Sequence, residues 1–342
     1  MKYIKNSFKN MVPYHSSLIT DGIILNANES PYDPPKEVID LFKKELDKVE
    51  FNRYPDMDER ELASSIAKHF NVNSDNVTIG VGSDELLDCV FRAVIDKGDK
   101  VVSFSPSFSM YKVFTELVGG EFIGVYDENY KIDVDSIIKA IKDNNPKLVL
   151  ICSPNNPTGE YLEEKDVRKI VESTEALVLL DLAYIDFSKY DYTRLAMEYD
   201  NVISFRTFSK AMSLPSIRCG YAISNSDNID MINVIKAPYS VTTISQILAN
   251  VAINNYDLYK NQIELIKDER KRLFVELNNL GFKVFDSEAN FIFVLMDDKY
   301  NDILLQNKIY IRKFKSGIYR ITIGSRIEND KLLEVLKCAK QK

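Results

Sequence analysis

Lys210 stands in a turn whose residue types could carry covalent chemistry. The turn, RTFSK at 206–210, follows the apolar stretch NVISF, and Arg218 comes eight residues after the lysine. A lysine amine can form a Schiff base with a carbonyl compound, and a nearby arginine can bind an anion. A solvated loop that happens to hold both cations is the alternative, and this segment taken alone does not decide between the two.

Two further polar segments follow apolar stretches. Asp181 comes directly after ALVLL, and Tyr184 stands three residues later. A carboxylate that leaves a buried strand needs a cationic partner, so a freely solvated acid is the weaker interpretation. After KLVLICS, the turn PNNPTG at 154–159 presents an asparagine side chain, although an ordinary loop of turn residues would look the same.

The segment GSDE at 82–85 follows the apolar stretch VTIGV and opens a helical pattern. A flexible turn with free backbone N–H groups at the positive end of a helix can form a phosphate cradle. An ordinary serine N-cap with acids in the first helical turn explains the same residues equally well. The segment alone does not decide between a phosphate site and an ordinary helix start, and the other polar segments must be considered with it.

One cofactor uses all of these groups. Pyridoxal 5′-phosphate (PLP) needs a lysine for its Schiff base, a carboxylate against its pyridinium nitrogen and donors for its phosphate. Asparagine and tyrosine can bind its ring oxygen, and an aromatic residue such as Phe108, in PSF at 106–108, can stack on its face. Together the segments predict a PLP site.

The elements that must position these groups alternate along the chain. From about residue 77, short apolar strands such as VTIGV, KVVSFS, KLVLICS and ALVLLD are separated by amphipathic helices. This alternation is typical of an α/β fold with a mostly parallel sheet covered on both faces, in which ligands bind at the carboxyl ends of the strands. The order of the strands cannot be read from this pattern.

A division into units follows from the same pass along the 342 residues. Residues 1–30 are too short and irregular to fold alone and are expected to form an N-terminal arm. Residues 31–245 form the large PLP-binding domain. After Pro238 a long helical stretch runs to Gly281 and leads into a smaller α/β unit, so residues 246–342 are assigned to a small C-terminal domain that includes the linking helix.

Composition excludes several classes of partner. The net charge is −7 and the acids and bases are interspersed, which argues against nucleic acid or an anionic membrane. No stretch has the apolar length of a signal peptide or a membrane span. The four cysteines lie far apart without CxxC spacing, which favours reduced thiols in the cytoplasm. With only His15 and His69, we expect no metal site and no chemistry that depends on histidine, although His15 could line a site.

On its motifs the chain resembles the fold type I, class II PLP-dependent aminotransferases, and within them the histidinol-phosphate branch. The resemblance covers nearly the whole length. The motifs that carry it are LNANESP at 25–31, RYP at 53–55, GSDEL at 82–86, PSFSMY at 106–111, SPNNPTG at 153–159, DLAYIDF at 181–187, RTFSKAMSLPSIRCGY at 206–221, SEANFIFV at 287–294 and YRITIGSRIEND at 319–330.

The resemblance implies a role for each cofactor-binding residue. Lys210 matches the Schiff-base lysine, Asp181 matches the pyridinium partner, and Asn156 and Tyr184 match the donors to the ring hydroxyl oxygen. Phe108 falls where the family places a stacking tyrosine. The residues that match the surroundings of the cofactor phosphate are Gly82, Ser83, Asp84, Thr207, Ser209, Arg218 and Tyr54, the last of which would cross a dimer interface.

The resemblance also implies a substrate site. Arg320 matches the arginine that holds the substrate α-carboxylate, with Asn156 beside it, and Arg312 and Tyr14 match the groups that receive the phosphate of histidinol phosphate. The implied activity is amino transfer from histidinol phosphate to 2-oxoglutarate in histidine biosynthesis. The implied assembly is a cytoplasmic homodimer with shared active sites.

Two departures from the family pattern leave alternatives open. Leu182 stands where the family commonly has glutamate, and PSI at 215–217 replaces a more usual Ala-Gly-Leu. They leave room for another amino-acid substrate or for a relative of phosphothreonine decarboxylase. A cofactor-binding regulator without turnover is disfavoured, because such proteins usually carry an added DNA-binding module and this chain leaves no room for one.

Overall fold

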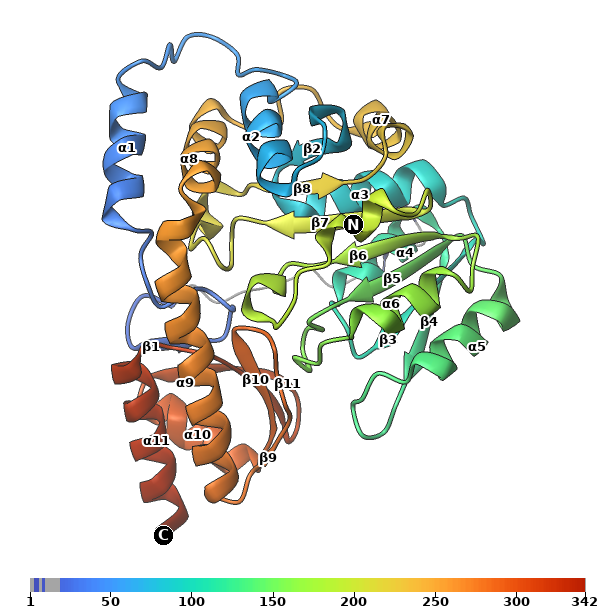
Figure 1. Ribbon diagram of the computed structural model, residues 1–342. Helices are drawn as coiled ribbons and strands as arrows, with labels where there is room; N and C mark the ends of the chain where they lie inside the picture. Colours follow the sequence, from blue (N-terminus) through green and yellow to red (C-terminus); the bar gives the residue numbers. More distant parts are fainter. Residues whose placement is uncertain (1–2, 6–7, 10–18, 342) are drawn as a thin grey trace.

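Two sheets organise the chain in the computed structural model, which describes residues 3–5, 8–9 and 19–341 (Figure 1). Tyr14 and His15 lie outside the described residues. The larger sheet and its helices form the upper part of the view, the smaller sheet forms the lower part, and one long helix runs between them.

The large sheet has seven strands, in the order β2-β8-β7-β6-β5-β3-β4. Its strands are β2 (Val77–Gly80), β3 (Lys100–Ser105), β4 (Glu121–Tyr126), β5 (Leu148–Cys152), β6 (Leu177–Asp181), β7 (Val202–Thr207) and β8 (Gly220–Ile223). β8 runs antiparallel to both of its neighbours, and the remaining pairs are parallel. The mostly parallel α/β sheet predicted from the alternating pattern is therefore confirmed.

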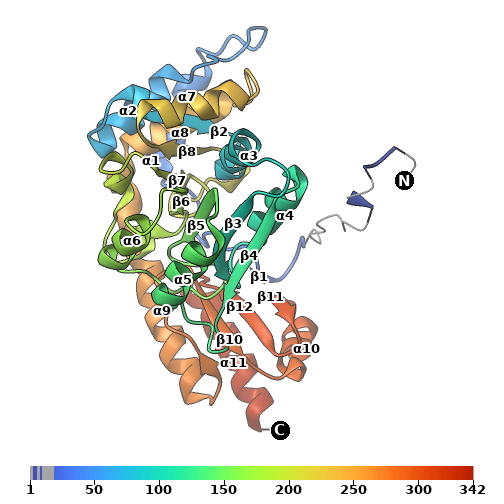
Figure 2. The same ribbon diagram turned by 90° about the vertical axis from the view of Figure 1, so that its right-hand side faces the viewer.

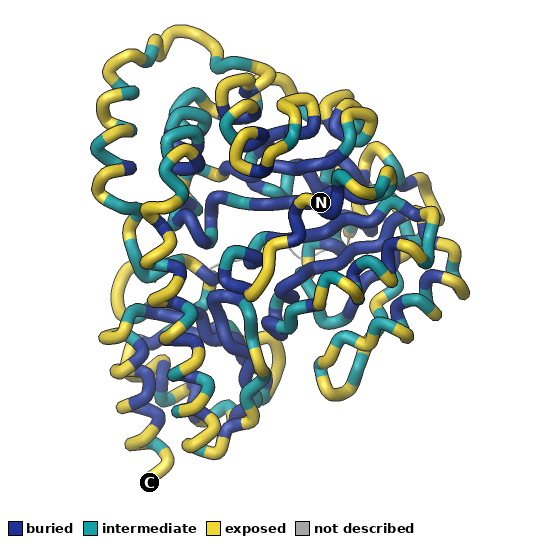
Figure 3. Tube along the Cα trace, viewed as in Figure 1, coloured by how far each residue is buried: buried dark blue, intermediate teal, exposed yellow. Residues whose placement is uncertain are grey.

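Helices cover both faces of this sheet because its central strands are apolar on both sides. One face packs against α3 (Gly82–Val94), α4 (Met110–Val118) and α7 (Ser226–Ile235). The other face packs against α5 (Val134–Asn144) and α6 (Glu164–Val171). Figure 2 shows these two layers from the side, and Figure 3 shows the buried strands between helices whose outer faces are exposed.

The small sheet has five strands, in the order β1-β11-β12-β10-β9. Its strands are β1 (Ile23–Leu25), β9 (Lys283–Val284), β10 (Phe291–Leu295), β11 (Ile309–Lys315) and β12 (Ile318–Thr322), and its helices include α10 (Asp298–Gln306) and α11 (Arg326–Gln341). β1 pairs parallel to β11, with Ile23 opposite Ile309. Part of the segment expected to be an arm thus contributes an edge strand, and both ends of the chain build one sheet.

The sequence pattern predicts one long helical stretch after Pro238, but the structure divides this stretch into two helices. It consists of α8 (Thr243–Asn254), a 3₁₀ turn at Tyr256–Tyr259 and α9 (Lys260–Asn279). Asn254 and Asn255 donate their side-chain amides to carbonyls one turn back, at 2.9 and 2.8 Å. Because asparagine side chains compete with the helical backbone for hydrogen bonds, this is a natural place for the helix to end.

The break between α8 and α9 affects where the boundary between the large and the small unit is placed. α8 packs on α1 (Lys36–Leu46) and α2 (Arg60–Phe70), beside the large sheet, whereas α9 continues down to the small sheet (Figure 1). We therefore propose that the boundary between the two units lies at the turn after α8 rather than at residue 245. Among the described residues, no helix combines the length and apolarity needed to span a bilayer.

Candidate active site

A cavity of about 180 Å³ lies at the carboxyl ends of the central parallel strands. It adjoins a larger cavity of about 1020 Å³, and Lys210, Tyr184 and Asn156 line both. The predicted residues that line the smaller cavity are Gly82, Ser83, Asp84, Phe108, Asn156, Asp181, Tyr184, Thr207, Ser209, Lys210 and Arg218. Arg312 and Arg320 line the larger cavity. The fold thus brings together residues that are far apart in the sequence.

Asp181 ends β6 and is buried on the floor of the smaller cavity. The Tyr111 hydroxyl donates to its Oδ2 at 2.6 Å, and the Ala183 N–H donates to its Oδ1 at 3.2 Å. Burial raises the pKa of Asp181 to about 6, against the opposing effect of the Tyr111 hydrogen bond. Among residues 3–5, 8–9 and 19–341, no lysine or arginine nitrogen forms an ion pair with this carboxylate. A cation bound in the cavity would supply the missing charge.

Lys210 follows β7 and reaches the same cavity from the side. Its Nζ donates to the Ala27 carbonyl at 3.2 Å and lies 5.9 Å from the centre of the Tyr184 ring. Burial, together with the positive charge of Arg320, lowers the pKa of Lys210 to about 8. An amine with this pKa is partly unprotonated near neutral pH and can act as a nucleophile or a base.

A chain of amides connects Arg320 to Tyr184. Arg320 Nη1 donates to Asn156 Oδ1 at 2.6 Å, and Arg320 Nη2 donates to the Asn26 carbonyl at 2.8 Å. The Tyr184 hydroxyl oxygen accepts from Asn28 Nδ2 at 3.0 Å and from Asn156 Nδ2 at 3.4 Å. These contacts hold the phenol and the guanidinium beside the lysine.

The opposite end of the smaller cavity can hold an anion. The first turn of α3, Gly82-Ser83-Asp84, lies there, and Arg218 Nη2 is 3.5 Å from Asp84 Oδ2. Gly82 has a φ of +75°, and a Cβ atom at this position would lie 2.9 Å from Arg218 Nη2. The positive φ favours glycine, and the missing Cβ leaves room for the arginine beside the helix N-terminus, an arrangement suited to phosphate.

Pyridoxal 5′-phosphate fits this set of residues. The buried carboxylate without a cationic partner suits a protonated ring nitrogen, the lysine amine suits the aldehyde, and the turn with Arg218 suits the phosphate. Phe108 lines the cavity between the two ends, where its ring can stack on a planar group. No cluster of potential metal ligands is found in the part of the chain that the structure describes.

The larger cavity is the place for a substrate. Arg312 on β11 and Arg320 on β12 are direct cross-strand partners, as expected for neighbouring strands. The Arg320 guanidinium lies 5.7 Å from the Phe314 ring centre and 5.2 Å from that of Phe291. Apolar walls come from Phe104, Phe114 and Phe122. A ligand here would meet two guanidinium groups at one end and aromatic rings beside them.

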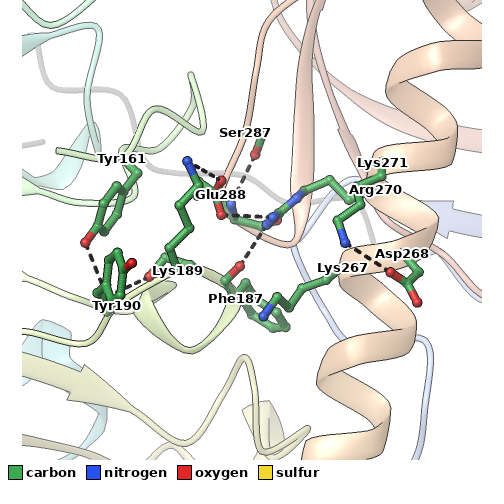
Figure 4. A network of polar contacts seen from close by, with 12 residues as sticks. Tyr161, Phe187, Lys189, Tyr190, Lys267, Asp268, Arg270, Lys271, Ser287 and Glu288 are labelled. Carbon is green, nitrogen blue, oxygen red and sulfur yellow. Dashed lines mark hydrogen bonds and ion pairs between the residues drawn. The ribbon is translucent and has the colours of Figure 1, made fainter. Parts of the chain in front are cut away.

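A polar joint ties the small sheet to the turn that carries Asn156, and Figure 4 shows the part of this joint around Arg270 and Glu288. Arg270 on α9 is buried and donates to the carbonyls of Phe187 and Ala289, at 3.0 and 2.9 Å, and to Glu288 Oε2 at 3.0 Å. The Glu288 N–H in turn donates to the Gly159 carbonyl at 2.8 Å. A Cβ atom on Gly159 would lie 2.2 Å from Ser287 Oγ, so this contact needs glycine.

Several predicted residues lie elsewhere. Tyr54 lines neither cavity; it is 82% exposed and stacks on Tyr239 with ring centres 4.8 Å apart. Tyr14, expected at the substrate phosphate, lies outside the described residues. His69 contacts the rings of Phe70 and Tyr256, away from both cavities. Leu182 is fully buried among the apolar residues beside α6, so its site offers no place for an acid that acts on the cofactor.

Other residues at the site were not predicted. Tyr111, which donates to Asp181, stands three residues after Phe108, and the two rings lie edge to face with their centres 5.5 Å apart. Asn28 belongs to the LNANE motif, whose role the sequence leaves open. Cys152 lines the smaller cavity at the end of β5.

A mostly parallel sheet with a lysine, a buried acid and an anion-binding turn at its strand ends defines a PLP-dependent enzyme. Residues 20–336 match the family Aminotransferase class I and II, and the chain belongs to this family.

Curated relatives and solved structures are similar over almost the whole chain. The histidinol-phosphate aminotransferase of Thermoanaerobacter sp. is 37% identical over 98% of this chain and 96% of its own length. That of Ruminiclostridium cellulolyticum is 33% identical over 97% of both chains. The structure of the histidinol-phosphate aminotransferase from Clostridium acetobutylicum superimposes with a TM-score of 0.85 at 25% identity, covering 93% of this chain and 99% of that one. The Sinorhizobium meliloti enzyme, solved in complex with pyridoxal-5′-phosphate, gives 0.85 at 24% identity, covering 93% and 91%.

Proposed function

We propose that this transaminase moves an amino group between histidinol phosphate and 2-oxoglutarate, as a step of histidine biosynthesis. The observation that carries the proposal is the pair of arginines, Arg312 and Arg320, side by side on β11 and β12 in the larger cavity. Relatives that are 33–37% identical and bear the name histidinol-phosphate aminotransferase support it.

We assign the proton transfer to Lys210. Its amine has a pKa of about 8 and is held beside Tyr184, so it can remove the proton from the substrate Cα and, in the opposite half-reaction, return a proton to that carbon. When bound, PLP supplies an electron sink for the charge left on that carbon. With PLP in the cavity, the Asp181 carboxylate would hold a proton at the ring nitrogen by direct charge attraction.

The two arginines must serve chemically different substrates. Glutamate and 2-oxoglutarate carry an α-carboxylate, which one guanidinium can bind in bidentate fashion. Histidinol phosphate has no carboxylate, so the α-carboxylate role expected of Arg320 applies only to the glutamate half of the reaction. The phosphate of histidinol phosphate has more charge and three oxygens, and we propose that it engages Arg320 and Arg312 together.

A steady-state assay with two alternative donors tests this function. Histidinol phosphate and phosphothreonine are each offered with 2-oxoglutarate, and both glutamate formation and carbon dioxide release are followed. The proposal predicts glutamate formation from histidinol phosphate without gas release. Carbon dioxide from phosphothreonine would instead support the decarboxylase alternative, and glutamate formed only from other amino acids would indicate a different donor.

We also propose a homodimer in which each site receives Tyr54 from a second copy, with the enzyme acting in the cytoplasm. The 82% exposure of Tyr54 and its stacking on Tyr239 support this assignment, since the ring is held at the surface, away from both cavities of its own chain. The test mixes two inactive variants, Lys210→Ala and Tyr54→Ala, under conditions that exchange subunits. Activity should return, because one hybrid site regains both native residues, and a mixture that stays inactive would refute sharing.

A further inference from the structure

We propose that Asn28 is a positioning residue that directs the Tyr184 hydroxyl proton into the cofactor cavity, an inference that rests on the proposed PLP site. Asn28 comes from the LNANE segment after β1 and is 1% exposed, with a φ of +55°. Asparagine adopts this left-handed conformation more readily than most residues. The buried side chain has no role in the chemistry described so far, yet its amide faces Tyr184.

The direction of the Asn28 amide is fixed by Thr322 at the end of β12. The Thr322 Oγ1 accepts the Asn28 backbone N–H at 3.0 Å and donates to Asn28 Oδ1 at 3.2 Å. A hydroxyl has one proton, and here it points at the amide oxygen. The amide nitrogen therefore faces Tyr184, where it donates to the phenol oxygen at 3.0 Å. Thr322 is 2% exposed, so water does not compete for these contacts.

The second amide at Tyr184 is fixed in the same way from the other side. Arg320 has only donors, so the atom of Asn156 that it contacts at 2.6 Å must be the amide oxygen. The Asn156 nitrogen then faces Tyr184 at 3.4 Å. The phenol oxygen accepts an N–H from both asparagines, and neither amide nitrogen can accept in return.

Because both asparagine amides donate to the phenol oxygen, the phenol proton points away from them, into the cavity. Tyr184 is 6% exposed and lines the cavity that holds Lys210, and burial raises its pKa so that the proton is retained at neutral pH. A ring oxygen of the cofactor in this cavity would thus meet a donor that is already oriented. Such a hydrogen bond stabilises an anionic ring oxygen and lowers the pH at which the Lys210–cofactor linkage loses its proton.

The test is a pH titration of the visible absorbance of the cofactor-bound enzyme, which needs no substrate. In Asn28→Asp the carboxylate accepts the Tyr184 proton, and the midpoint should rise by about one pH unit or more. Asn28→Ala, which offers no acceptor, should move the midpoint much less. Tyr184→Phe gives the reference value for complete loss of the donor.

Thr322 supplies the matched pair of variants. Thr322→Val removes the proton that orients the Asn28 amide, so the amide can turn its oxygen toward Tyr184 and the midpoint should rise. Thr322→Ser keeps the hydroxyl and should leave the midpoint unchanged. If Asn28→Asp does not fold, this pair decides the question alone.

Three results would overturn the inference: equal midpoints in wild type and Asn28→Asp, equal rises in Asn28→Ala and Asn28→Asp, or equal behaviour of the two Thr322 variants. A wild type without any visible band after PLP is added would instead overturn the proposed cofactor site. The failure of this inference and that of the proposed function are therefore distinguishable.

Discussion

The floor and the roof of the active site are built from different kinds of sheet. The floor consists of parallel strand ends in the large sheet, where Asp181 and the turn after β7 are enclosed by helices on both faces. The roof is the antiparallel hairpin β11–β12 of the small sheet, whose register shifts between Lys313 and Lys315, both exposed. A dry, rigid floor suits chemistry that every substrate shares, whereas a half-solvated hairpin suits the choice between substrates.

Within the roof, the cross-strand pair Arg312 and Arg320 shows a similar difference in burial. Arg320 is 7% exposed and is held by Asn156 and the Asn26 carbonyl, while its partner Arg312 is half-buried. Arg320 is therefore held in place to meet the anionic group of every substrate, whether that group is a carboxylate or a phosphate. Arg312 is more exposed, so its side chain can help to discriminate between substrates.

Removing Lys210 should give the largest effect. Lys210→Ala lacks the amine that attaches the cofactor and moves the proton, so turnover should be lost with every donor. In the wild type, borohydride should fix PLP to a single peptide that contains Lys210, as identified by mass spectrometry. Attachment to any other lysine would show that Lys210 is not the residue that binds the cofactor covalently.

Asp181→Asn should be nearly as damaging while leaving the volume of the side chain unchanged. The amide cannot hold a proton at the ring nitrogen, so we expect cofactor binding to persist and kcat to fall by several powers of ten, consistent with a charge contact of several kcal/mol in a dry site. The fall should be the same for histidinol phosphate and glutamate. Near-normal turnover would show that the carboxylate is not the pyridinium partner.

Although Asp181→Asn should lower turnover, it should raise the stability of the cofactor-free protein at neutral pH. The pKa of Asp181 is about 6 in the fold against an ordinary value of 3.8, so the folded state binds the proton more tightly. Stability should therefore fall as the pH rises from about 4 to 6, by up to about 3 kcal/mol. Cofactor-free Asp181→Asn should be more stable than wild type at pH 7 by up to that amount, with the gap closing toward pH 4.

Urea unfolding of both proteins, at several pH values and without PLP, measures this gap. Arg312→Ala, a change on the roof, serves as the control and should follow the wild-type pH dependence. A constant difference between wild type and Asp181→Asn across the range would contradict the raised pKa.

Arg312→Ala should give the smallest and most selective change in catalysis. Loss of a charge-assisted contact to phosphate costs on the order of 1.5 to 3 kcal/mol, which is about tenfold to a hundredfold in kcat/KM for histidinol phosphate. Glutamate should hardly be affected, because Arg320 alone binds its α-carboxylate. Arg320→Lys is the matched control and should impair both substrates. Equal losses in Arg312→Ala would remove its phosphate role.

The sequence was sufficient for those parts of the site that depend on local order. Strand ends follow from apolar runs, so Asp181, Lys210 and the turn at Asn156 could be placed at one edge of the sheet before the strand order was known. Arg312 and Arg320 could likewise be placed on adjacent strands.

Features that depend on tertiary contacts were not predictable. Tyr111 reaches Asp181 only because α4 packs on one face of the large sheet, and Asn28 reaches Tyr184 only because β1 joins the small sheet. The break between α8 and α9 depends on asparagine side chains whose competition with the backbone is weak in isolation.

The pairing of β1 with β11 has a consequence for how the protein is made on the ribosome. Ile23 emerges early in synthesis but finds its partner, Ile309, only near the other end of the chain. The strands of the large sheet can meet long before that, because their partners lie closer in sequence. A nascent chain should therefore carry a folded floor and an unpaired first strand, and the pocket closes only when the last hairpin leaves the ribosome.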